Sequence, residues 1–167
     1  MISHLVCALS LVVFYTLQNA VFSQTTLISG TADVILLLLA AWSLQPQFKN
    51  VWLWTIIAGG LISLTSAMPY FAPLIGYLGV VSISKLLQVR IWRVPIFAMF
   101  IVTFFGTIYQ HMIYILSLQI SGASIPWRVS LDQVVLPSLL LNLIFALPVY
   151  AIVSELVGRI YPLEVET

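Results

Sequence analysis

The chain has 167 residues, of which 62% are apolar and 7% are charged. Soluble domains carry about 25% charged residues, so this composition excludes a water-soluble enzyme and a disordered linker and predicts an integral membrane protein. The length fits one bundle, and we expect a single membrane domain over 1–167. A net charge of +1 offers no basic face for nucleic acid, and one cysteine, Cys7, excludes an internal disulfide framework.

Long uncharged runs predict an all-α, polytopic bundle of about six transmembrane helices. A crossing helix needs about 20 mostly apolar residues and must satisfy its own backbone in lipid. In chain order, the predicted spans cover approximately 4–22, 29–44, 51–68, 72–88, 95–119 and 131–160. Pro69 and Pro73 favour a division of residues 51–88 into two short helices, and a re-entrant hairpin is the alternative.

Basic residues are distributed unevenly between the predicted connections. If the N-terminus is cytoplasmic, Arg128 is the one basic residue of six on the outer side, which is a strong positive-inside bias. Six spans also return the C-terminus to the cytoplasm. Lys85, Arg90 and Arg93 are predicted to form a basic cytoplasmic loop that contacts anionic lipid or docks a cytoplasmic partner. Lys85 can reach the headgroups from within its span.

Catalytic motifs are absent from the sequence. It contains no nucleotide-binding loop, no HExxH and no GxSxG pattern, so we predict no catalytic residue, no metal site and no cofactor. His111 and Asp132 together fall short of a zinc ligand set, and we expect His111 to form a hydrogen bond between helices. Glu155 and Arg159 have the i,i+4 spacing of a helical ion pair.

Polar side chains within the spans are the best candidates for functional residues. Asp33 precedes a leucine-rich run, where the free N–H groups of a helix start favour a carboxylate. Gln110 shares a face of the fifth span with three other polar residues, and Asn142 stands in the sixth. Such groups turn toward other helices because lipid offers them no partner. We predict that all three are structural or partner-binding, with a ligand pocket as the alternative. Glycines at 59, 60, 76 and 79 are expected at close helix contacts.

Several stretches, taken in order, resemble the rod shape-determining protein MreD family. Gly30–Leu39 is similar to the start of that family's second span, with Asp33 kept and Ala32 where proline is usual. The strongest similarity is Leu136–Leu143 followed by Ala146–Tyr150. Further similarities, covering most of residues 26–162, are Gly59–Leu64 with Pro69 and Gly76, and Phe105-Gly106-Thr107.

This resemblance implies a non-enzymatic scaffold in the bacterial inner membrane. Members of the family bind the bitopic protein MreC and help link MreB filaments to peptidoglycan synthesis, so a RodA-type glycosyltransferase and a class B penicillin-binding protein are possible further partners. The implied fold is similar to the substrate-binding S-components of energy-coupling-factor transporters. A vitamin-binding subunit is therefore the alternative function, with a pocket that Gln110, His111, Trp127 and Asp132 could line.

Overall fold

The computed structural model describes residues 2–22, 29–90, 94–123 and 126–161, and helices account for its regular structure. This confirms the all-α prediction, and each of the six predicted spans contains a helix. In chain order the elements are α1 (Ile2–Leu17), the π-helical turn η1 (Gln18–Phe22), α2 (Val34–Leu44), α3 (Val51–Thr65), α4 (Phe71–Arg90), α5 (Pro95–Ile120), α6 (Trp127–Ser130), the π-helical turn η2 (Leu131–Val135) and α7 (Leu136–Ile160).

The helices fall into two length classes. Four described stretches are long and apolar enough to cross a membrane, namely Ile2–Ala20, Phe71–Val89, Pro95–Ile120 and Trp127–Ile160. In contrast, α2 has 11 residues and α3 has 15. At 1.5 Å per residue, α2 is about 16 Å long, roughly half the thickness of a bilayer core. The prediction of a crossing helix over 29–44 is therefore wrong, because α2 starts only after Asp33.

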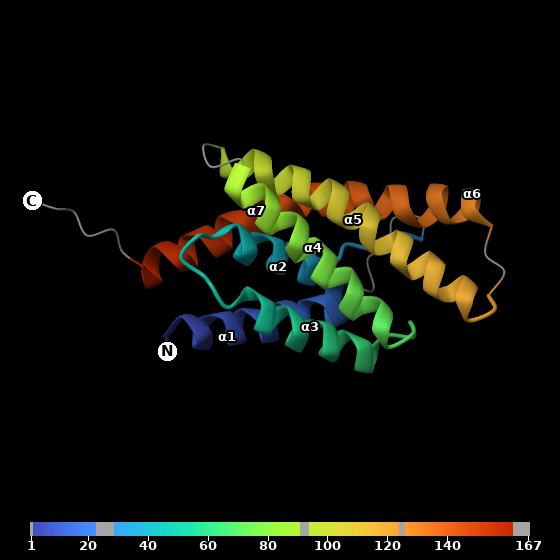
Figure 1. The fold of residues 1–167 in the computed structure, drawn as a ribbon, viewed down its shortest axis with the longest axis horizontal. Coiled ribbons are helices and arrows are strands. Elements are labelled where there is room, and N and C mark those ends of the chain that lie inside the picture. Colours follow the sequence, from blue (N-terminus) through green and yellow to red (C-terminus); the bar gives the residue numbers. More distant parts are fainter. Residues whose placement is uncertain (1, 23–28, 91–93, 124–125, 162–167) are drawn as a thin grey trace, which may run out of the picture.

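Helix α2 forms the centre of the bundle (Figure 1). All of its residues are buried, and it contacts α1, α3, α4, α5 and α7. A helix that is apolar on every side can be stable in the middle of a protein or in lipid, and here the other helices supply the apolar surroundings. The surrounding helices turn large apolar side chains outward, among them Leu5, Leu64, Leu86, Phe105 and Ile144. Such a surface suits a lipid environment.

The division between the third and fourth predicted spans is confirmed as two helices. Helix α3 ends at Thr65, and α4 starts at Phe71. The Ser63 hydroxyl donates a hydrogen bond to the Tyr70 carbonyl at 2.6 Å, which ties the end of α3 to the turn.

Close packing between helices depends on three of the four glycines expected at such contacts. A Cβ on Gly59 would lie 3.0 Å from the Leu74 Cα, and one on Gly76 would lie 3.0 Å from the Gln110 Cγ. At Gly79 the added atom would overlap the ring of Tyr109. The prediction for Gly60 is wrong, because a Cβ added there would have no neighbouring atom of the described residues within 4 Å.

The bundle has two distinct ends, which Figure 1 shows at left and right. The start of α1, the α2–α3 connection, the end of α4 and the end of α7 lie together at left; we call this the Gln45 end, after the C-cap of α2. The α3–α4 turn and the start of α6 lie at right, and α2 starts near the middle of the bundle, with its N-terminus directed toward that side. We call the region around this start the Asp33 end, after the N-cap of α2.

Candidate functional site

Asp33 is the N-cap of α2, so the N-terminal placement proposed from the sequence is confirmed. Its Oδ1 accepts a hydrogen bond from the Leu36 backbone N–H at 2.9 Å. The first N–H groups of a helix have no partner within the helix, and a capping carboxylate satisfies one of them and interacts favourably with the helix dipole. The same carboxylate also accepts hydrogen bonds from two other helices.

The two further donors are neutral side chains on α4 and α5. The Tyr77 hydroxyl donates to Asp33 Oδ2 at 3.0 Å, and Gln110 Nε2 donates to the same oxygen at 2.8 Å. Gln110 Nε2 also donates to the Tyr114 hydroxyl at 2.8 Å. Tyr77 is 1% exposed and Gln110 is 0% exposed, so these contacts join α2, α4 and α5 within the protein interior.

Asn142 of α7 completes this network from the opposite side. Its Oδ1 accepts from the Asp33 backbone N–H at 2.7 Å, and its Nδ2 donates to the Thr107 hydroxyl of α5 at 3.0 Å. The structure therefore brings Asp33, Gln110 and Asn142 together, although they are far apart in sequence. We call these three residues, with Tyr77 and Thr107, the Asp33 network.

The non-helical segment before α2 depends on side chains for its backbone hydrogen bonds. The Thr31 N–H donates to Ser138 Oγ at 3.0 Å. Gln18 of η1 donates to the Ala32 carbonyl at 3.0 Å and accepts from the Val34 N–H at 2.8 Å. A Cβ on Gly30 would lie 2.6 Å from the Ser138 nitrogen, so this close approach requires glycine. Unpaired backbone groups are costly away from water, and these contacts allow the segment to lie inside the bundle.

Two cavities adjoin the Asp33 network. One of about 200 Å³ is lined by Asp33, Tyr77, His111 and Tyr114, among others. The other, of about 360 Å³, shares His111 and Tyr114 with the first and extends along apolar side chains of α5 and η2. Trp127 and Asp132 are not among the described residues that line either cavity, so the pocket anticipated from the sequence has a different lining.

The remaining polar residues have simpler surroundings. The expectation that His111 links two helices is wrong, because its Nδ1 bonds to the Thr107 carbonyl of its own helix at 2.9 Å. The predicted pair of Glu155 and Arg159 is confirmed, at 2.9 Å on the exposed surface. Lys85 Nζ donates to Gln88 Oε1 at 3.0 Å. Arg90 is the last residue of α4, but its side chain is outside the described part of the structure. Arg93 lies outside the described residues altogether.

The chemistry available to this site is limited to hydrogen bonding and one carboxylate. Within the described ranges, no group of three or more His, Cys, Asp or Glu side chains could hold a metal ion. The hydroxyl of Ser138 accepts from a backbone N–H rather than facing a base. Comparisons with family models, with curated proteins and with solved structures find no match for this chain.

Proposed function

We propose that this protein is a non-enzymatic scaffold of the bacterial cell-shape machinery, as the resemblance to the MreD family suggests. In this role it would sit in the inner membrane, bind an MreC-like bitopic protein and link MreB filaments to peptidoglycan synthesis. One observation carries the proposal: two of the stretches that resemble the family, Gly30–Leu39 and Leu136–Leu143, contact each other through the Thr31–Ser138 and Asp33–Asn142 hydrogen bonds.

The use of the polar side chains also supports a scaffold. Asp33, Tyr77, Gln110 and Asn142 bond to one another or to the backbone, and these bonds hold four helices in fixed positions. A scaffold needs such a rigid body with outward apolar faces, against which a partner helix can pack in lipid. Among the four long described helices, α1 is the least covered by the rest of the bundle.

The direct test is co-purification from native membranes after mild crosslinking. We expect a single-span periplasmic protein of the MreC type to be recovered with the wild-type chain. Asp33→Ala should reduce this recovery more than Lys85→Ala, because Lys85 has a flexible side chain that reaches the headgroups, whereas Asp33 is bonded to three other residues. Recovery is normalised to the amount of folded protein, so that loss of the fold is not counted as loss of the partner.

Equal recovery from the wild type and both variants would contradict the role of Asp33. Recovery of an ATPase-containing complex in place of an MreC-like protein would contradict the scaffold itself.

The cavities beside the Asp33 network favour a second candidate, the small-molecule-binding subunit of a vitamin transporter. Binding sites for small molecules are concave and mostly apolar, with a few convergent polar groups. The larger cavity is mostly apolar, and the smaller one brings several polar groups together, among them Asp33, His111 and Tyr114. Mass spectrometry of small molecules extracted from the purified protein separates the candidates, since the transporter subunit would carry a vitamin in stoichiometric amount.

A further inference from the structure

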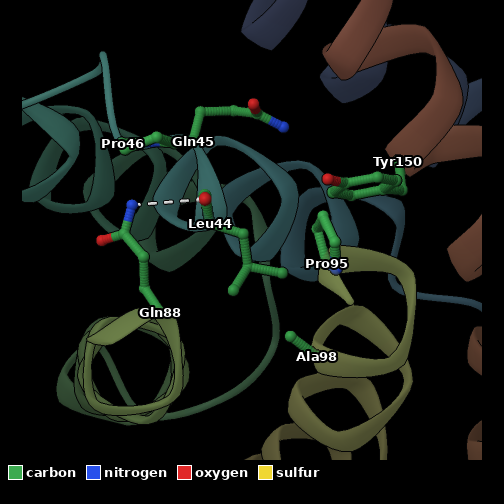
Figure 2. A pocket seen from close by; sticks show the side chains of 7 residues that line it. All are labelled: Leu44, Gln45, Pro46, Gln88, Pro95, Ala98 and Tyr150. Carbon is green, nitrogen blue, oxygen red and sulfur yellow. Dashed lines mark hydrogen bonds between the residues drawn. The ribbon is translucent and has the colours of Figure 1, made fainter. Parts of the chain in front are cut away.

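A separate pocket of about 270 Å³ lies at the Gln45 end of the bundle, away from the Asp33 network. Figure 2 shows its seven lining residues, which come from the end of α2, from α4, from the first turn of α5 and from α7. They are Leu44, Gln45, Pro46, Gln88, Pro95, Ala98 and Tyr150. Four helices therefore build the pocket, and their polar groups define what it can bind.

Gln45 leaves an unused donor in this pocket. Its backbone is fully engaged, with its N–H donating to the Trp42 carbonyl and its carbonyl accepting from the Phe48 N–H, both at 3.2 Å. Its side chain is 7% exposed, and Nε2 makes no hydrogen bond of good geometry among the described residues, although the Gln45 amide interacts with the neighbouring Tyr150 hydroxyl. Figure 2 shows the amide extending across the pocket toward the Tyr150 hydroxyl. An unsatisfied buried donor costs about 1–3 kcal/mol, so a ligand that accepts from Nε2 would relieve this cost.

Two of the acceptors around the pocket are already used. The Leu44 carbonyl accepts from Gln88 Nε2 at 3.2 Å (dashed in Figure 2), and Gln88 Oε1 accepts from Lys85 Nζ. The first turn of α5 contributes Pro95 and Ala98, and the N-cap, Val94, makes no side-chain capping bond. The positive end of this helix dipole therefore lies at the pocket. None of the seven described lining residues is acidic, so the pocket suits an anionic group with several acceptor oxygens.

A partly apolar hollow adjoins the pocket at Tyr150. It has a volume of about 670 Å³ and runs between α5 and α7, past Ile96, Leu147 and Ala151. The one carboxylate that lines it, that of Glu155, is paired with Arg159 at 2.9 Å. A pocket with two side-chain donors and a helix N-terminus, next to an open hollow with an apolar stretch along Ile96, Leu147 and Ala151, matches an amphiphile with an anionic head and a hydrocarbon tail.

We propose that this pocket binds the phosphate group of a membrane phospholipid. Gln45 Nε2 and the Tyr150 hydroxyl donate to the phosphate oxygens, and an acyl chain lies along Ile96 and Leu147. Trp52 and Trp54 in the first turns of α3 lie at the same end of the bundle, which is the placement of side chains at headgroup depth. The same donors could take a soluble phosphate ester, and the experiment distinguishes the two sources. The inference does not depend on the scaffold function.

The test is native mass spectrometry of the full chain after delipidation in detergent. We add phosphatidylglycerol, diacylglycerol with the same acyl chains, or glycerol 3-phosphate, each at equal concentration. The wild type should retain one phosphatidylglycerol in preference to diacylglycerol. Gln45→Leu and Tyr150→Phe should each weaken this binding about tenfold, since each removes one hydrogen bond to a charged group.

Gln47→Leu and Tyr70→Phe are the matched controls, because both residues are exposed and lie outside the pocket. Both should bind as the wild type does. Thermal unfolding of every variant checks the fold. If Gln45→Leu is unstable, Tyr150→Phe still tests the site, because it removes only one hydroxyl group. Equal binding by wild type, Gln45→Leu and Tyr150→Phe would overturn the site. Glycerol 3-phosphate bound as tightly as phosphatidylglycerol would overturn the assignment to a lipid.

Discussion

The two ends of α2 have opposite hydrogen-bond balances. At its N-terminus, Asp33 accepts from Leu36, Tyr77 and Gln110, and its own N–H has an acceptor in Asn142. At its C-terminus, Gln45 retains a buried Nε2 with no partner in the described structure. One helix of 11 residues thus joins a region where every donor facing the carboxylate is paired, and where the buried Gln110 Oε1 is an acceptor without a partner in the described structure, to a region with an unused donor.

This contrast separates stability from binding within the molecule. Burying a polar group is unfavourable unless a hydrogen bond compensates for it. At the Asp33 end, the carboxylate and the donors that face it meet this requirement internally, with Gln110 Oε1 as the buried acceptor left unpaired, so loss of the carboxylate should lower stability. The Gln45 end does not, so changes there should alter what the protein binds and leave stability intact or higher.

The largest effect should come from Asp33→Ala. It removes a helix cap worth about 1 kcal/mol and leaves the buried Tyr77 hydroxyl without its acceptor, at about 1–3 kcal/mol. Gln110 Nε2 loses one of its two acceptors and keeps the Tyr114 hydroxyl. We expect the free energy of unfolding to fall by about 2–4 kcal/mol in total, measured by denaturation in detergent micelles. Asp33→Asn, which keeps an acceptor oxygen, should lose clearly less; equal losses would mean that hydrogen bonding is not the cause.

Asn142→Leu should have an intermediate effect. It deprives the Asp33 N–H of its acceptor and the Thr107 hydroxyl of a donor, and we expect a loss of about 2 kcal/mol in the same measurement. Thr103→Val is the matched control on α5, because the buried Thr103 hydroxyl already has no partner among the described residues. If both variants lost the same stability, hydrogen bonding in the Asp33 network could not explain the loss.

The smallest effect, with the opposite sign, should come from Gln45→Leu. The substitution removes an unsatisfied donor and keeps a similar side-chain volume, so we expect stability in lipid-free detergent to be unchanged or to rise by up to about 1 kcal/mol. Thermal unfolding with and without added phosphatidylglycerol measures this. A loss of stability comparable to that of Asp33→Ala would remove the contrast between the two ends.

The sequence supports the helix count but not the place of α2. Proline, charge and turn residues separate the apolar runs, and these features predict six helical segments correctly. Hydropathy cannot tell a helix surrounded by protein from one surrounded by lipid, because both are apolar on every side. Hydropathy also extends the predicted span over residues 29–33, where hydrogen bonds to Ser138 and Asn142 replace the helical ones.

The sequence was sufficient to select the residues of the site, but it could not predict that they contact one another. Asp33, Gln110 and Asn142 stand out because each is polar within an apolar span. Gln110 is 77 residues and Asn142 is 109 residues from Asp33 along the chain. No local pattern in the sequence indicates which helix faces meet. Tyr77 does not stand out, because a tyrosine in a membrane helix usually indicates an interfacial position. Its place next to Gly76, where α4 approaches Gln110 closely, is the signal that could have found it.

The short central helix also bears on how the chain is made. During synthesis, α2 leaves the ribosome long before α5 and α7, the helices that carry Gln110 and Asn142. At that moment α2 is too short to cross the bilayer alone, and the Asp33 carboxylate at its N-terminus makes burial in lipid unfavourable. We therefore expect α2 to reach its final position only after α5 and α7 are made, by an inward docking step that follows their insertion.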